Sequence, residues 1–331
     1  MGEDMRFTLL GTAIFAALVL AASKTAVAAF SDRPSENFTP QTLIETLAEP
    51  SSIAQSANQT ESTVTKLNLS EPVDALQSFR KMLCSVEDGK TTYFVWQGKG
   101  FSRRPGERDR HLFNVQGMSA RACVSMTSES GSPGFRQVSR EVMLYLDPET
   151  NEILETWENP WTDEMNTVVP VANDPVNTSP MWADETGRRL QFQTFGDADI
   201  VFLTTTIPLF YPNPLGGEYQ LYVGGQYHAM EMFNFSASLS DLLADADRDL
   251  DEVAVSWSRI SPWLPWMEMG DRPGELVFHA ASTRLLEWQQ LPEPLKSQIE
   301  GDYALYQEPP ALDDERPNQT TWTNFLEYLK R

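Results

Sequence analysis

The sequence predicts a mainly β protein built around an antiparallel sheet, on three observations. Between residues 90 and 236, apolar and polar residues alternate with period two in successive runs, as in half-buried strands. These runs are rich in Val, Phe, Tyr and Thr, and turn-forming segments such as RPGERD, ESGSPG and FGDAD separate them. Long helical patterns are missing between the runs, which disfavours the βαβ units of a parallel sheet.

The N-terminus has the pattern of a secretory signal peptide. An apolar run over residues 7–22 follows Arg6, and Ala26-Val27-Ala28 forms an A-x-A cleavage site. The run is short for a bilayer span of roughly 20 residues, and Lys24 interrupts it. We therefore expect residues 1–28 to be a cleaved leader and the protein to be exported to the periplasm or the extracellular space. An uncleaved membrane anchor is the alternative.

A polar segment and a helix follow the leader. Residues 29–70 are dominated by Ser, Thr, Asn, Gln and Pro, which is typical of a flexible linker. Residues 71–85 then place Val73, Leu76, Phe79 and Leu83 at helical spacing behind Ser70, which we predict to be the N-cap. We expect this helix to open a single β-rich domain over residues 71–331.

The alternating runs define the strands of that domain. Asp147-Pro148 marks the clearest hairpin turn between two of them. A sheet of eight or more strands must bury one face, so we expect a barrel-like roll (calycin- or lipocalin-like) with a few short peripheral helices. The predicted strands cover residues 91–101, 111–126, 135–146, 153–159, 167–173, 189–195, 200–207 and 219–238.

The last third of the chain mixes both patterns. Residues 239–253 show one apolar stripe at helical spacing, and two further strands are predicted over 253–260 and 275–283. These strands flank a segment rich in Trp and Pro. Residues 321–331 form a predicted C-terminal helix that packs back on the domain.

Composition and charge narrow the class of function. The chain has 331 residues, of which 41% are hydrophobic and 22% charged, and its formal net charge is −22. Such acidity argues against binding to nucleic acid or to an anionic membrane surface. The G-x-S-x-G, G-x-G-x-x-G and Walker A motifs are missing, so we expect no nucleotide cofactor. Cys84 and Cys123 form either one disulfide or two buried free thiols.

The chain has three histidines, and no two of them have the close spacing in sequence that is typical of a zinc site. They are His111, His228 and His279. We therefore predict no preformed metal site. Strand parity directs either His228 or Glu231 toward the interior, where the inward residue would be a candidate for acid–base chemistry. A metal-dependent enzyme is an alternative, and it requires His228 and His279 to lie within about 5 Å of each other because ligand bonds are about 2 Å long.

Three specific motifs stand out in the chain. They are Asn159-Pro160-Trp161-Thr162, Asn173-Asp174-Pro175-Val176 and Trp263-x-Pro265-Trp266-Met267, followed by Gly270, Pro273-Gly274 and His279. With these motifs, residues 72–291 resemble the family called domain of unknown function 1838, although Asp163-Glu164 stands where a Gly-Glu turn is more familiar in that family. The resemblance implies no catalytic assignment.

The same motifs suggest a pocket. Proline ends the strands before Trp161 and after Asn173-Asp174, which presents these side chains at strand ends. Trp263, Trp266 and Met267, together with Arg259 and His279, either line a mostly apolar cavity or plug the end of the sheet. In the plug, Arg259 would pair with Asp174 or Glu268.

We therefore expect a protein that binds a small apolar or aromatic molecule. If the protein is an enzyme, His279 or His228 with Asp174 or Glu231 would supply metal-independent acid–base catalysis, and Arg259 would orient an anionic group. A non-catalytic structural or interaction protein of the cell envelope is the alternative. The sequence leaves the oligomeric state open.

Overall fold

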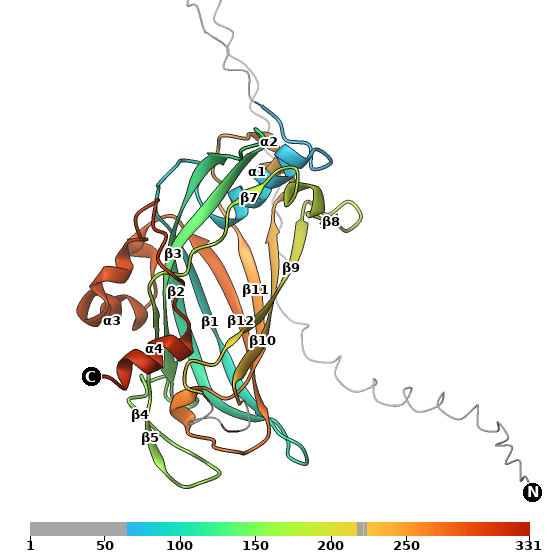
Figure 1. Ribbon diagram of the computed structural model, residues 1–331. Helices are drawn as coiled ribbons and strands as arrows, with labels where there is room; N and C mark the ends of the chain where they lie inside the picture. The colour runs from blue at the N-terminus through green and yellow to red at the C-terminus, as the bar shows by residue number, and fades with distance from the viewer. Residues whose placement is uncertain (1–64, 217–220, 222–223) are drawn as a thin grey trace, which may run out of the picture. The chain divides into compact units, whose positions relative to one another are not determined.

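An open, curved antiparallel sheet forms the centre of the structure (Figure 1). The computed structural model describes residues 65–216, 221 and 224–331, so the predicted leader and most of the predicted linker lie outside the described residues. The mainly β, antiparallel prediction is confirmed. The ten strands are β1 (Thr92–Arg103), β2 (Arg110–Thr127), β3 (Pro133–Leu146), β6 (Val171–Asn173), β7 (Met181–Trp182), β8 (Phe192–Thr194), β9 (Val201–Pro212), β10 (Gln226–Ala237), β11 (Ala254–Ser261) and β12 (Glu275–Leu285).

The remaining elements are short and lie around this sheet. A separate two-stranded sheet is made by β4 (Thr156–Glu158) and β5 (Met165–Thr167). The α-helices are α1 (Pro72–Leu83), α2 (Leu239–Ala244), α3 (Leu295–Asp302) and α4 (Thr321–Tyr328). The 3₁₀ helices are η1 (Gly187–Arg189), η2 (Pro265–Met267), η3 (Trp288–Gln290) and η4 (Ala304–Gln307).

The sheet curls without closing into a barrel. Its strand order is β6–β3–β2–β1–β12–β11–β10–β9–β8, with β7 on β3, and within the described residues no ladder joins β6 to β8. Both terminal strands have only three residues, too few to build a long closing ladder. The C-terminal segment covers the β6 side instead, where the Gln319 amide donates to the Pro175 carbonyl at 2.9 Å.

Each face of the sheet is packed by a helix of its own, over part of its area. We call the face that carries Phe94 and Trp96 of β1 the inner face, and the face that carries Tyr93 and Val95 the outer face. At one end of the inner face, α1 packs in a cluster that also contains Phe94. On the outer face, α3 packs against Tyr93 and Val95. A second inner cluster lies around Phe113 at the other end.

Three local predictions need correction. The helix predicted over 239–253 ends at Ala244, because the Asp245 carboxylate accepts from the Asp247 amide in an Asx turn that competes with helix. The turn after Asp147 forms, yet β4 pairs with β5 and not with β3. The N-cap of α1 is Glu71 and not Ser70, and the Glu71 side chain makes no capping hydrogen bond.

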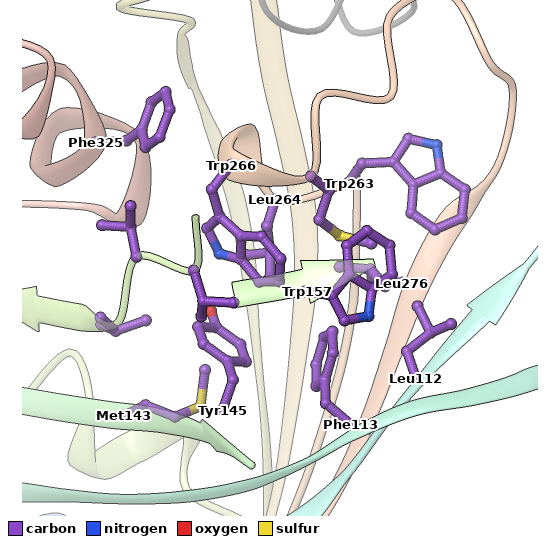
Figure 2. Close-up of a cluster of buried hydrophobic side chains, with 14 of the residues drawn as sticks. Leu112, Phe113, Met143, Tyr145, Trp157, Trp263, Leu264, Trp266, Leu276 and Phe325 are labelled. Carbon is purple, nitrogen blue, oxygen red and sulfur yellow. The ribbon is translucent and has the colours of Figure 1, made fainter. Parts of the chain in front are cut away.

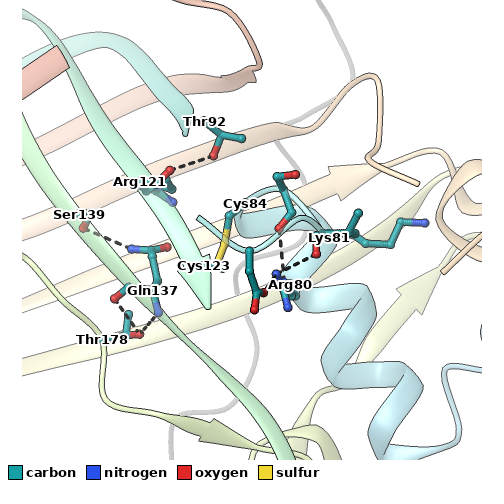
Figure 3. Close-up of a disulfide and its surroundings, with 12 residues drawn as sticks. Arg80, Lys81, Cys84, Thr92, Arg121, Cys123, Gln137, Ser139 and Thr178 are labelled. Carbon is teal, nitrogen blue, oxygen red and sulfur yellow. Dashed lines mark hydrogen bonds and ion pairs between the residues drawn. A yellow bond between two sulfur atoms is a disulfide. The ribbon is translucent and has the colours of Figure 1, made fainter. Parts of the chain in front are cut away.

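A disulfide links α1 to the sheet. Cys84, directly after α1, bonds Cys123 of β2 across a Cα–Cα distance of 6.1 Å, and both residues are fully buried (Figure 3). Of the two states that the sequence left open, the structure therefore has the disulfide. Among the described helices, none has the length and apolarity needed to cross a bilayer.

Candidate ligand-binding site

The Trp-rich segment is a plug and not a pocket wall. Trp263 and Met267 are 0% exposed and Trp266 is 2% exposed. The helix η2 directs the Trp266 indole into an aromatic cluster, 5.2 Å from the Tyr145 ring and 5.7 Å from the Trp157 ring between centroids (Figure 2). This segment therefore belongs to the core that closes one end of the sheet.

The two candidate histidines lie on the outer face of the sheet, and the predicted sharing of one metal ion by the pair is wrong. His279 is exposed and its Nδ1 is 3.1 Å from the Ser258 hydroxyl, while the exposed His228 stacks on Phe210. In the strand register, His279 of β12 is aligned with Met232 of β10, two strands away. Met232 lies four residues along β10 from His228. Strand spacing and rise then separate the two histidines by about 16 Å, too far for one metal ion.

A cavity of about 410 Å³ lies on the inner face between the two inner clusters. Residues from both clusters line it, as does the C-terminal segment 318–321. Its size falls in the range of small-molecule sites, about 300–1,000 Å³. The aromatic lining residues include Trp96, Tyr211, Phe233 and Trp257, and the polar ones include Ser119, Arg121, Glu141, Asn173, Glu231 and Arg259.

Arg259 and Glu231 form the first charged group of the cavity. They are direct cross-strand partners on β11 and β10, and Arg259 Nη1 donates to Glu231 Oε1 at 3.1 Å. Arg259 Nη2 also donates to the Tyr227 hydroxyl oxygen at 2.6 Å. Burial by itself would lower the pKa of the Arg259 guanidinium. Tyr227 and Glu231 outweigh the effect of burial, so that this pKa is raised. The Arg259 guanidinium therefore stays ionised.

Glu141 and Asn173 form the second group. They are partners on β3 and β6, and Asn173 Nδ2 donates to Glu141 Oε1 at 2.7 Å. Burial raises the pKa of Glu141, and the nearby Glu231 adds to the rise; the Asn173 hydrogen bond, Arg259 and Arg121 oppose it without cancelling it. Glu141 has no ion pair within the described residues, in contrast to Glu231.

The raised pKa of Glu141 predicts a pH dependence of stability. The folded state holds the proton more tightly than the unfolded state, so this stabilisation is present below the ordinary Glu pKa near 4.3 and is lost as pH rises through the folded pKa. We expect Glu141→Gln to have a higher Tm than the wild type at pH 8, with the difference shrinking toward pH 4. Circular dichroism melts at several pH values measure this, and a constant difference would contradict it.

Arg121 of β2 is a half-buried arginine that forms no ion pair within the described residues, although Glu141 attracts its charge. Its guanidinium lies 4.1 Å above the Phe94 ring centroid, and its side chain makes no hydrogen bond or ion pair within the described residues. Burial lowers the pKa of Arg121 to about 9, so it is still cationic at neutral pH. The attraction of Glu141 offsets only part of the desolvation of this charge, so an anionic group next to the guanidinium would stabilise it further.

Other polar atoms in the cavity walls also lack partners. Trp96 Nε1, Arg121 Nε and Arg259 Nε are buried donors without acceptors in the part of the chain that the structure describes, and Asn173 Oδ1 is a buried acceptor without a donor. Buried polar groups are paired in most folded proteins. Donors outnumber acceptors here, so the walls favour a molecule that brings acceptor oxygens.

Two further predicted site residues lie away from the cavity lining. Asp174 forms ion pairs with Arg140 at 2.7 Å and with Arg316 at 2.9 Å, and so fastens the C-terminal segment. Trp161 packs on Trp263 and lies under the guanidinium of Arg104. The pairing of Arg259 with Asp174 or Glu268 is wrong, because Glu231 takes that place.

The structure therefore brings together three of the predicted residues, Asn173, Glu231 and Arg259, and adds others that the sequence reading missed. The missed residues had a sequence signal. Arg121 shares strand parity with the buried Cys123, and Glu141 shares parity with the buried Tyr145. Both faces of β2 and β3 are largely buried, and a charge within such an apolar strand is unusual and indicates an internal polar site.

The fold and the cavity define a class of protein, an open antiparallel sheet that encloses a polar, aromatic-lined hollow. Within that class, the chain belongs to the family described as Protein of unknown function (DUF1838), whose model matches residues 89–329. The resemblance predicted from the motifs is confirmed. A search of curated proteins finds no match.

Proposed function

We propose that the protein binds a small aromatic or apolar molecule that carries an anionic oxygen group, such as a carboxylate. The ligand would lie on the inner face of the curved sheet, as in a calycin-like binding protein. The predicted leader would place this function in the periplasm or outside the cell. The observation that carries the proposal is the Arg121 guanidinium in the wall of an aromatic-lined cavity, which has no ion pair or side-chain hydrogen bond among the described residues.

The lining supplies a place for both parts of such a ligand. Trp96 and Trp257, whose ring centroids are 6.5 Å apart, offer apolar surface on neighbouring sides of the cavity. Gly117 leaves room for the Trp96 indole, since an added Cβ would lie 2.5 Å from that ring. Arg121 supplies the charge, and a charge-assisted hydrogen bond to a carboxylate contributes about 1.5–3 kcal/mol.

The alternative of a purely structural envelope protein has one supporting observation, the completely buried Trp plug. That alternative does not account for the cavity beside the plug, nor for the unpaired donors in its walls. A structural core would be expected to fill such a space with apolar side chains.

Arg121→Met tests the proposal with two matched probes, 2-naphthoate and the uncharged 2-naphthamide. We expect the variant to lose about 10–100-fold in naphthoate affinity, because the charged contact is removed, and to bind naphthamide nearly unchanged. Without ligand, the variant should unfold at the same or a higher urea concentration than the wild type, since the desolvation of the Arg121 charge, which Glu141 offsets only in part, is gone. Isothermal titration calorimetry and urea unfolding measure the two effects.

Arg103→Met provides the control, because Arg103 is exposed and paired with Asp109 at 2.7 Å. Its naphthoate affinity should equal that of the wild type. If the wild type binds neither probe, or if Arg121→Met binds naphthoate as tightly as the wild type, the proposed function is wrong.

A further inference from the structure

Building on the proposed function, we propose that the cavity is an active site in which Glu141 transfers a proton to and from carbon in an aromatic acid with a C–H bond next to a carbonyl group. The two cavity carboxylates differ in their surroundings, and this difference assigns the role. Glu231 is fixed by the Arg259 guanidinium at 3.1 Å. Among the described residues, Glu141 receives a side-chain hydrogen bond from the neutral amide of Asn173 alone, at 2.7 Å.

The Glu231 carboxylate is engaged in its ion pair with Arg259, whereas Glu141 forms no ion pair within the described residues and lines the same cavity. Burial, together with the nearby Glu231, raises the pKa of Glu141 above its ordinary value. A carboxylate that lines a cavity without a fixed counter-charge can act as a general base. The groups that face Glu141 are Arg121 on β2, Asn173 on β6, Glu231 on β10 and Arg259 on β11.

The step balances without an oxidant or a second reactant. The ionised Glu141 carboxylate removes a proton from the carbon next to the carbonyl, and the C–H electron pair forms a C=C bond while the carbonyl π pair moves onto oxygen. The resulting enolate oxygen carries negative charge, which cationic donors such as Arg121 and Arg259 can stabilise. Protonated Glu141 then returns the proton to carbon or to the enolate oxygen.

The walls also restrict the substrate class. A carboxylate base removes a proton from carbon only when the resulting negative charge spreads onto an oxygen that finds donors. The unpaired donors Trp96 Nε1, Arg121 Nε and Arg259 Nε surround the same cavity as Glu141. An aromatic 2-oxo acid meets these requirements, because it combines a ring, a carboxylate and a carbonyl-activated methylene.

Phenylpyruvate is a suitable probe, and its exchange in D₂O tests the inference. Proton NMR follows the replacement of its methylene hydrogens by deuterium, with and without the full chain. We expect the wild type to accelerate exchange over buffer and Glu141→Gln to lose at least about 100-fold of that acceleration, as for removal of a general base. The Kd for phenylpyruvate should change less than about threefold, because Gln keeps the acceptor for Asn173.

The pH profile provides a readout that a structural role would not change. The wild-type exchange rate, corrected for buffer, should rise with pH through a midpoint above the ordinary Glu value of about 4.3, and this rise should vanish in Glu141→Gln. Glu158→Gln, on β4 and exposed, is the matched control and should exchange like the wild type.

The outcomes separate the two proposals. Phenylpyruvate binding without accelerated exchange overturns the catalytic inference and leaves the binding function intact. If Glu141→Gln loses binding and exchange together, Glu141 is a binding residue and the inference is wrong. If neither phenylpyruvate nor 2-naphthoate binds, the proposed function fails and the inference fails with it.

Discussion

Trp266→Ala is expected to lower the free energy of unfolding by about 3–5 kcal/mol, the range found when a large aromatic core residue is truncated. The indole is 2% exposed and packs among Phe113, Tyr145 and Trp157. Alanine would leave a void that these rings cannot fill without leaving their positions. Urea unfolding followed by circular dichroism measures the loss.

Trp288→Ala is the matched control for removal of an indole. Trp288 is only partly buried on the outer face, where its ring contacts Tyr93 and its Nε1 donates to Glu300. We expect a clearly smaller loss of stability, because less apolar area leaves water when the protein folds. If Trp266→Ala is as stable as the wild type but no longer binds 2-naphthoate, the Trp segment is part of the binding site and not a plug.

Replacing both Cys84 and Cys123 by Ala is expected to destabilise the fold by about 4 kcal/mol, the chain-entropy value for a closed loop of this size. The disulfide joins residues 39 apart in sequence and fixes the end of α1 against β2 (Figure 3). Its loss frees the unfolded chain more than the folded one. The midpoint of urea unfolding measures the change.

The single variants serve as the internal control for the disulfide. Either substitution removes the same cross-link, so each single variant and the double variant should lose similar amounts of stability. Wild-type protein unfolded and refolded in a strong reductant should match them. Additive losses from the two single substitutions would mean that packing of the side chains, and not the cross-link, provides the stability.

The strands were predictable because turn residues separate them and β-branched and aromatic residues fill them. The runs around 111–126 and 135–146 coincide closely with β2 and β3. By contrast, α3 was not predicted: it has eight residues, of which Leu295 and Ile299 are buried, and so short an apolar stripe gives little periodic signal.

Parity alone did not decide which residues face the cavity. In β1, Tyr93 and Val95 on one face and Phe94 and Trp96 on the other are all apolar, because α3 covers the outer face and the two inner clusters cover the inner face. The alternation of apolar and polar residues distinguishes the two faces of a sheet only where one face is exposed to solvent. In β10 the reason differs: the outer face is exposed at His228 and Met230, but the apolar Met230 obscures the alternation in the sequence.

By itself, the sequence determined the antiparallel β class, the family and the residue types of a polar site, since these depend on local patterns and on short motifs. Tertiary structure alone decided that the tryptophans plug the sheet, that the histidines face outward and that Arg121, Glu141, Glu231 and Arg259 share one cavity. Strand register and the curvature of the sheet bring these four residues together from four strands, and neither property is encoded in any single stretch of the chain.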